Sequence, residues 1–125
     1  MVALKLRVMP MSDDGVAGTI YVQTTLKVLG GKWKLLILWN LKDCKRRFSE
    51  LKRLMPTISE KMLIQQLREL EKDGLVHRHV YLQVPPKVEY SFTDYAESLI
   101  PVLQVLCDWG EKHLERFSDN SKSDV

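Results

Sequence analysis

The spacing of apolar residues predicts five helices along the chain. Residues 32–41 are almost uncharged and apolar on most faces, so we expect a helix buried at the centre of a small domain. Gly30–Gly31 should end the helix that precedes it. The apolar run is too short to span a bilayer, which takes about 20 residues. The other four predicted helices are residues 21–29, 48–55, 60–73 and 93–117.

The predicted helix at residues 60–73 is clearly amphipathic. Ser59 can cap its first turn, and Gly74 can end it. The apolar residues that recur at the i, i+4, i+7 spacing of one face are Leu63, Leu67 and Leu70. The polar residues on the opposite face are Lys61, Gln65, Arg68 and Lys72. We therefore expect one face in the core and the other in solvent or against a partner.

A period of two replaces the helical period after Gly74. Residues 76–84 alternate as a strand does, Pro85–Pro86–Lys87 turns the chain, and residues 88–92 return as a second strand. Residues 2–8 also alternate, which predicts a short strand or a mobile arm. The predicted organisation is an N-terminal arm at residues 1–20, one domain at 21–117 and a polar tail at 118–125.

The composition fits one globular domain and excludes several classes of protein. The 125 residues are 45% hydrophobic and 28% charged, which is too apolar for a disordered chain. The N-terminus lacks the apolar core of a signal peptide, and the two cysteines lack metal-site spacing, so we expect a reduced, cytoplasmic protein. The chain has no nucleophile elbow, phosphate loop or metal motif. We therefore predict no enzymatic activity, no cofactor, no metal and no membrane partner.

Charge is distributed unevenly along the chain. Residues 1–92 hold 16 Lys and Arg against 9 Asp and Glu, a net of +7. Residues 93–125 hold 3 against 7, a net of −4. The basic part is therefore a candidate for a polyanion partner, although uneven charge without a function is an alternative.

The order of these elements is typical of a winged helix-turn-helix. This α+β fold is mostly helical, and here it would have a two-stranded wing and a long C-terminal dimerisation helix. The helix at residues 60–73 would enter the DNA major groove, where Arg can read guanine, Gln can read adenine and Lys can contact phosphate or guanine. A solvated helix face and an ordinary two-stranded cap are the alternatives. The order of the elements and the charge asymmetry together favour DNA.

A basic stretch precedes this helix, KDCKRRFSELKR at residues 42–53. We expect the first half of this stretch to form a polar turn. Its Lys and Arg side chains would contact DNA phosphates on both sides of the major groove. The candidate contacts there are Arg46, Arg47 and Ser49.

Three stretches of the chain are distinctive: LKVLGGKWKLLILWNL, RRFSELKRLMPTISEKMLIQQLRELEKDGLVHR and VYLQVPPKVEYSFTDYAESLIPVLQVLCDWG. Together they resemble the HxlR-type winged-helix transcription regulators, relatives of the MarR group, over about residues 22–114. The resemblance implies a bacterial or archaeal homodimer that binds double-stranded DNA at a near-palindromic operator, with no small-molecule effector identified. The recognition-helix residues that it implies are Ser59, Lys61, Met62, Gln65 and Arg68, and the wing-tip residues are Pro85, Pro86 and Lys87.

One position departs from the pattern of this family. Members that sense oxidants or electrophiles usually have a cysteine about ten residues before the glycine pair, and this chain has Ile20 there. Thiol sensing at the position that these family members use is therefore not expected. The glycine pair itself would let the dimerising first helix turn sharply into the next.

The last predicted helix has more apolar surface than a small core needs. One stripe consists of Leu99, Leu103, Leu106, Leu114 and Phe117, and a second of Val102, Val105 and Trp109. A helix that is apolar on two sides must be covered on both, so we expect its own domain on one side and a second subunit on the other. A single wide core contact is the alternative. The predicted dimer residues are Leu26, Leu99, Leu103, Leu106, Trp109 and Leu114.

The remaining chemistry-bearing residues have simpler interpretations. Cys44 is a candidate redox residue because neighbouring cations favour the reactive thiolate, but a turn cysteine without that role is preferred. Cys107 lies on the apolar side of the last helix and is expected in the core or an interface. His77 and His79 share a strand face without a third ligand, so a solvated strand is preferred to a metal site. The residues expected to pack rather than to form a ligand cage are Trp33, Trp39 and Trp109.

A winged-helix protein-interaction module is the main alternative to a DNA-binding regulator. Such a module uses the same faces of the fold to bind other proteins. Affinity for duplex DNA that falls with salt would distinguish the two, because phosphate contacts release counterions.

Overall fold

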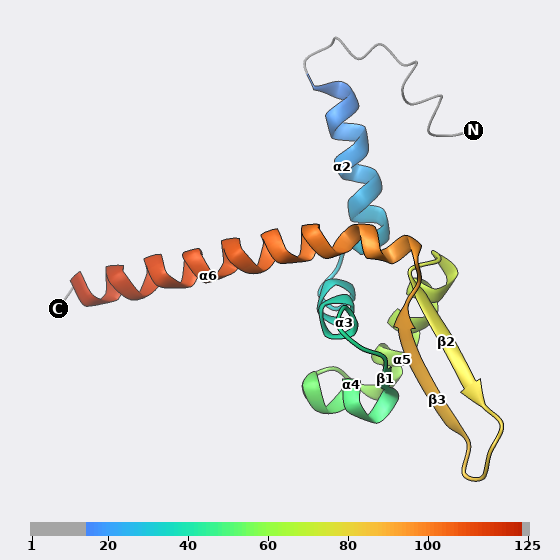
Figure 1. Ribbon diagram of the computed structural model, residues 1–125. Helices are drawn as coiled ribbons and strands as arrows, with labels where there is room; N and C mark the ends of the chain where they lie inside the picture. The colour runs from blue at the N-terminus through green and yellow to red at the C-terminus, as the bar shows by residue number, and fades with distance from the viewer. Residues whose placement is uncertain (1–14, 124–125) are drawn as a thin grey trace.

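Two long helices, α2 and α6, extend from a group of shorter helices and a β-sheet in the computed structural model (Figure 1). The structure describes residues 15–123 of the chain, and the side chains of residues 15–118. The elements in chain order are α2 (Val16–Leu29), α3 (Lys34–Leu41), β1 (Arg46–Arg47), α4 (Phe48–Leu54), α5 (Glu60–Lys72), β2 (Val76–Tyr81), β3 (Lys87–Phe92), the 3₁₀ helix η1 (Tyr95–Leu99) and α6 (Ile100–Ser123). The winged helix-turn-helix architecture predicted from the sequence is confirmed.

The hydrophobic core forms around α3, as the sequence predicted for residues 32–41. This helix contacts α4, α5 and β3, so its apolar side chains are covered from several directions. The fully buried large side chains are Ile37, Leu38, Leu41, Leu51, Ile58, Leu63, Leu67, Leu70 and Val76. The apolar stripe of the amphipathic helix is thus in the core, as expected. Trp33 and Trp39 pack against this cluster.

The two glycines between α2 and α3 are required for different reasons. A side chain at Gly30 would collide with the carbonyl oxygen of Leu26, which accepts a hydrogen bond from the Gly30 N–H. Gly31 has a φ of +92°, which L residues rarely adopt. Close approach at one position and a left-handed backbone at the next allow the sharp turn between the helices.

Both ends of α5 have the signals expected from the sequence. The Ser59 hydroxyl accepts a hydrogen bond from the Met62 N–H at 3.1 Å, which satisfies a donor of the first turn. At the other end, Gly74 has a φ of +77°, and the Leu75 N–H donates to the Leu70 carbonyl at 2.9 Å. These contacts set where the helix begins and ends, and therefore which residues face outward.

Three strands in the described part of the chain form an antiparallel sheet in the order β1-β3-β2. The predicted turn at residues 42–47 is shorter than expected, because Arg46 and Arg47 form β1 opposite Tyr90 and Glu89 of β3. This pairing joins segments that are far apart in the sequence, so local periodicity did not reveal it. The hairpin was predicted correctly, although β2 ends at Tyr81 instead of residue 84.

The two long helices extend past their predicted boundaries. Helix α2 starts at Val16, within the predicted arm, and α6 continues to Ser123, within the predicted tail. The strand predicted at residues 2–8 lies outside the described residues. The last helix begins at Ile100 and not after Thr93 as predicted, because residues 95–99 form η1. The Thr93 hydroxyl accepts from the Ala96 N–H of η1 at 3.1 Å and donates to the Gly74 carbonyl at 2.6 Å.

Candidate nucleic-acid interface

The polar face of α5 is on the outside of the domain. Four of the residues predicted to contact DNA are exposed on this face: Lys61, Gln65, Arg68 and Lys72. A shallow groove runs along this face, lined by Glu60, Lys61, Ile64, Gln65, Arg68 and Glu69. Since the apolar face of α5 is in the core, these side chains are presented to solvent on a rigid helix.

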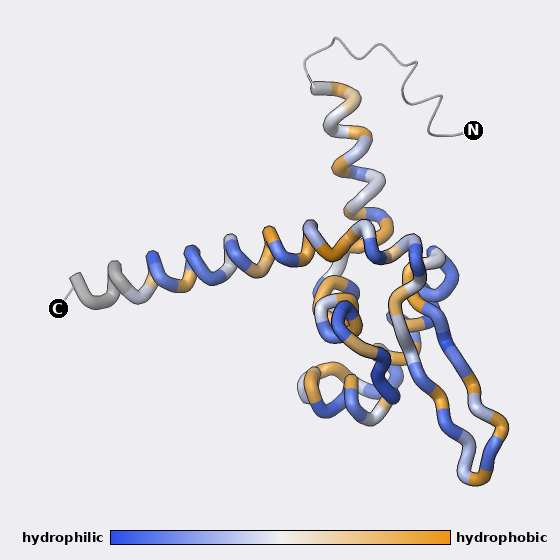
Figure 2. The backbone as a smooth tube through the Cα atoms, viewed as in Figure 1, coloured by the Kyte–Doolittle hydropathy of each residue, from blue (hydrophilic) through white to orange (hydrophobic). Residues whose placement is uncertain are grey.

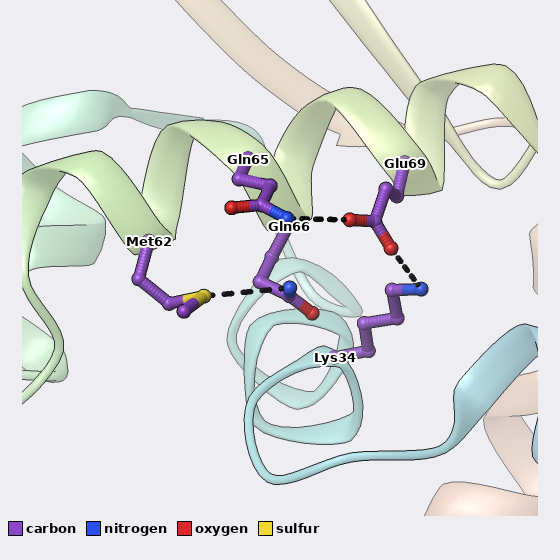
Figure 3. A network of polar contacts seen from close by, with 5 residues as sticks. All are labelled: Lys34, Met62, Gln65, Gln66 and Glu69. Carbon is purple, nitrogen blue, oxygen red and sulfur yellow. Dashed lines mark hydrogen bonds and ion pairs between the residues drawn. The ribbon is translucent and has the colours of Figure 1, made fainter.

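A chain of polar contacts connects this face to the core (Figure 3). The ammonium of Lys34, at the start of α3, lies 2.7 Å from Glu69 Oε1. The other carboxylate oxygen of Glu69 accepts a hydrogen bond from Gln65 Nε2 at 3.3 Å. The hydrogen bond from Lys34, and then that from Gln65, hold the pKa of Glu69 below its usual value. The contact of Lys34 with Glu69 was not predicted from the sequence. A lysine at the start of an otherwise apolar run was the only sign that Lys34 needs a carboxylate partner.

Two predicted contacts on α5 also have structural roles. Met62 is half-buried, packs against the core, and its sulfur accepts a hydrogen bond from Gln66 Nε2 at 3.5 Å (Figure 3). The Ser59 hydroxyl is exposed but already accepts the capping hydrogen bond. The outward face of α5 therefore consists mainly of its longer polar side chains.

The basic residues before α4 differ in their burial and hydrogen bonding. Arg46 is half-buried, and its Nε donates to the Asn40 carbonyl at 2.6 Å. Arg47 is exposed at the cap of α4, and its backbone N–H donates to Glu50 Oε1 at 2.8 Å. Ser49 is exposed in the first turn. Arg47 and Ser49 are thus available for a phosphate, whereas Arg46 contributes to the fold.

Lys87 belongs to a cluster at the base of the wing loop. Its ammonium lies 3.7 Å from Glu89 Oε2 and 4.6 Å from the centre of the Tyr81 ring. The Tyr81 hydroxyl donates to Glu89 Oε1 at 2.7 Å; this bond raises the pKa of Tyr81 and lowers the pKa of Glu89. The exposed tip of the wing consists instead of residues 82–86.

A pocket of about 360 Å³ lies where α5 packs beside the sheet. Its lining residues are Ile64, Leu67, Arg68, Glu71, Arg78 and Tyr90. The guanidinium groups of Arg68 and Arg78 make no hydrogen bond or ion pair with any residue that the structure describes. Sequence reasoning noted Arg78 only as part of the strand alternation. Arg78 shares one face of the alternating strand with Val76 and Val80, and this alternation indicated the side toward α5.

Comparison with known proteins identifies the family. The model of the HxlR-like helix-turn-helix family matches residues 28–118. The chain belongs to this family. The HTH-type transcriptional regulator YtcD of Bacillus subtilis is 59% identical over 97 residues, covering 78% of this chain and 77% of that protein.

Two solved structures of regulators are similar to this chain. The crystal structure of YtcD has a TM-score of 0.73 at 57% identity and covers 75% of this chain and 96% of that one. The redox regulator HypR in its reduced form has a TM-score of 0.74 at 48% identity and covers 78% of this chain and 97% of that one. The relatives are transcriptional regulators and not enzymes, and DNA binding is a property of the family.

Apolar residues recur along α2 and α6 (Figure 2), and several of them are exposed. Leu103 is 3% exposed and belongs to the subunit's own core, and Leu99 packs against that core. Leu103, which the sequence predicted in a dimer contact, therefore has no surface left for a partner. The apolar residues of α2 and α6 that remain exposed include Val22, Leu26, Val105, Leu106, Trp109, Leu114 and Phe117.

The other candidate residues lie at the surface. Cys44 and Cys107 are exposed free thiols, so Cys107 is not in the core of the subunit. His77 and His79 share a strand face with ring centres 6.0 Å apart. Within residues 15–123 the structure has no group of three His, Cys, Asp or Glu that could hold a metal ion. None of the described helices combines the length and apolar character that a membrane crossing needs.

Proposed function

We propose that this HxlR-like regulator binds duplex DNA sequence-specifically, as a homodimer on a near-palindromic operator. The observation that supports the proposal is the exposed polar face of α5, opposite a fully buried apolar stripe. Arg68 on this face and Arg78 beside it have no polar partner among the described residues. An amphipathic helix held in this way can enter the major groove with several side chains directed at base edges.

The proposed contacts fall into two groups. Gln65 and Arg68 are the base-reading candidates, because an amide suits adenine and a guanidinium suits guanine. The candidates for phosphate contact are Lys61, Lys72, Arg47, Ser49 and Arg78. Lys87 is proposed as a weaker wing contact, since Glu89 already neutralises part of its charge.

The dimer is proposed from the surplus apolar surface of α2 and α6. Leu106, Trp109 and Leu114 are 48%, 66% and 68% exposed in the subunit. Large apolar side chains repeated along two helices are typical of an interface between subunits. A two-fold dimer would also place two α5 helices on successive major grooves, about 34 Å apart, as a palindromic operator requires.

Selection of bound sequences from random duplexes, using the purified protein, tests this proposal. A regulator of the proposed kind selects an inverted repeat, and its affinity falls steeply as salt rises. A protein-interaction module selects no sequence. The cytoplasmic location expected from the sequence stays a prediction.

A further inference from the structure

Lys34 is a residue that local physics disfavours at its position. It is 7% exposed, and it is the only buried charged residue among the side chains that the structure describes. It also occupies the first position of α3, where the helix dipole repels a positive charge. Apolar residues that replace a buried ion pair are often at least as stabilising. Stability alone therefore does not explain a lysine here.

The partner of Lys34 is a carboxylate that has a second contact. Glu69 Oε1 accepts from Lys34 at 2.7 Å, while Glu69 Oε2 accepts from Gln65 at 3.3 Å. Lys34 comes from α3 in the core, and Gln65 is on the outward face of α5 (Figure 3). Glu69 thus bridges a buried charge and a base-reading candidate.

The bridge selects one orientation of the Gln65 amide. An ionised carboxylate only accepts hydrogen bonds, so the NH₂ end of the amide must face Glu69, and the Gln65 carbonyl oxygen must point elsewhere. Lys34 favours the ionised form of Glu69, whose pKa is lowered. One amide hydrogen and the carbonyl oxygen of Gln65 remain free. A donor and an acceptor side by side are what the N7 and N6 atoms of adenine require.

We propose that Lys34 is a positioning residue for base recognition, which acts through Glu69 to hold the Gln65 amide in the orientation that reads adenine. The inference rests on the proposed function, because it assumes that Gln65 meets a base edge. Sequence preference at one base of each half-site would then depend on a residue that never contacts DNA.

The test compares binding to the selected operator with binding to operators substituted at the base that Gln65 reads. Lys34→Met removes the charge and keeps an unbranched side chain that can fill the same space. We expect it to lower the adenine preference about 10-fold, within the range of one bidentate contact. Gln65→Ala should abolish the preference. In the Gln65→Ala background, Lys34→Met should change it no further, because both substitutions remove one contact.

Two further variants separate positioning from general effects. Lys32→Met removes the same charge from an exposed lysine next to α3 and should leave the preference unchanged. Glu69→Gln alters a side chain that is 42% exposed, so the fold should survive, and it lets either end of the Gln65 amide face the bridge. It should lower the adenine preference as Lys34→Met does, which keeps the test valid if Lys34→Met does not fold.

The outcomes distinguish this inference from the function on which it rests. If Gln65→Ala loses the preference while folded Lys34→Met or Glu69→Gln retains it, the positioning role is wrong and the proposed function stands. Additive losses in the double variant would also contradict positioning. If the unsubstituted protein selects no sequence, the proposed function itself fails.

Discussion

The winged-helix core and the two long helices use similar apolar patterns with opposite results. Leu63, Leu67 and Leu70 of α5 are fully buried, whereas Leu106 and Leu114 of α6 are 48% and 68% exposed. The difference lies in their surroundings, since α5 is covered by α3 and the sheet, and α6 is covered only near its start (Figure 1). Apolar periodicity therefore predicts an apolar helix face without telling whether the rest of the same chain covers it.

The largest expected effect comes from placing a charge on the uncovered stripe. Leu106→Glu should give a monomer by light scattering and abolish specific binding, because an unpaired charge in an apolar interface costs several kcal/mol. Leu67→Ala in the core should instead lower the free energy of unfolding by about 2–5 kcal/mol, measured by urea titration of the subunit. An unsubstituted protein that is monomeric at micromolar concentration would contradict the proposed dimer.

Removal of the proposed base contact of Arg68 on α5 should have the next largest effect. Arg68→Ala should weaken operator binding by about 1–3 kcal/mol and relax the preference at one position of each half-site. Fluorescence anisotropy with substituted duplexes measures both quantities. Equal weakening on all duplexes would reassign Arg68 to phosphate contact.

The two sides of the wing should differ in their electrostatic contribution. Arg78→Ala should weaken binding to all sequences alike and reduce the slope of log affinity against log salt by about one. Lys87→Ala should reduce that slope by less, because Glu89 lies 3.7 Å from its ammonium. A larger change from Lys87→Ala than from Arg78→Ala would reverse the assignment of these two residues.

Acid should weaken the contacts of Glu69 with Lys34 and Gln65. The pKa of Glu69 is lowered in the folded state from an ordinary value of 4.5, so its contribution to stability is present above pH 4.5. That contribution is lost as the pH falls through the lowered value. The difference in free energy of unfolding between the unsubstituted protein and Glu69→Gln should therefore be constant near neutrality and shrink in acid. If this difference stays constant until Glu69 is fully protonated, the contact between ionised Glu69 and Lys34 does not contribute to stability.

The smallest expected effect concerns the exposed thiol before β1. Cys44→Ser should leave the response of DNA binding to an oxidant the same as in the unsubstituted protein, since a turn cysteine without a role is the interpretation that we prefer. A gel-shift titration with and without diamide measures this response. An oxidant effect that disappears in Cys44→Ser would make Cys44 the sensor.

The sequence by itself determined the elements whose signals are local. The period of residues 60–73, the cap at Ser59 and the stop at Gly74 were sufficient for α5, and hence for the outward position of Gln65 and Arg68. Only the tertiary structure decided the features that join distant segments: the pairing of Arg46 with Tyr90, the contact of Lys34 with Glu69, and the burial of Leu103 beside an exposed Leu106. Caps and periodicity depend on neighbours within one or two helical turns. A contact between α3 and α5, or between β1 and β3, depends on how whole elements pack, and no local pattern specifies that arrangement.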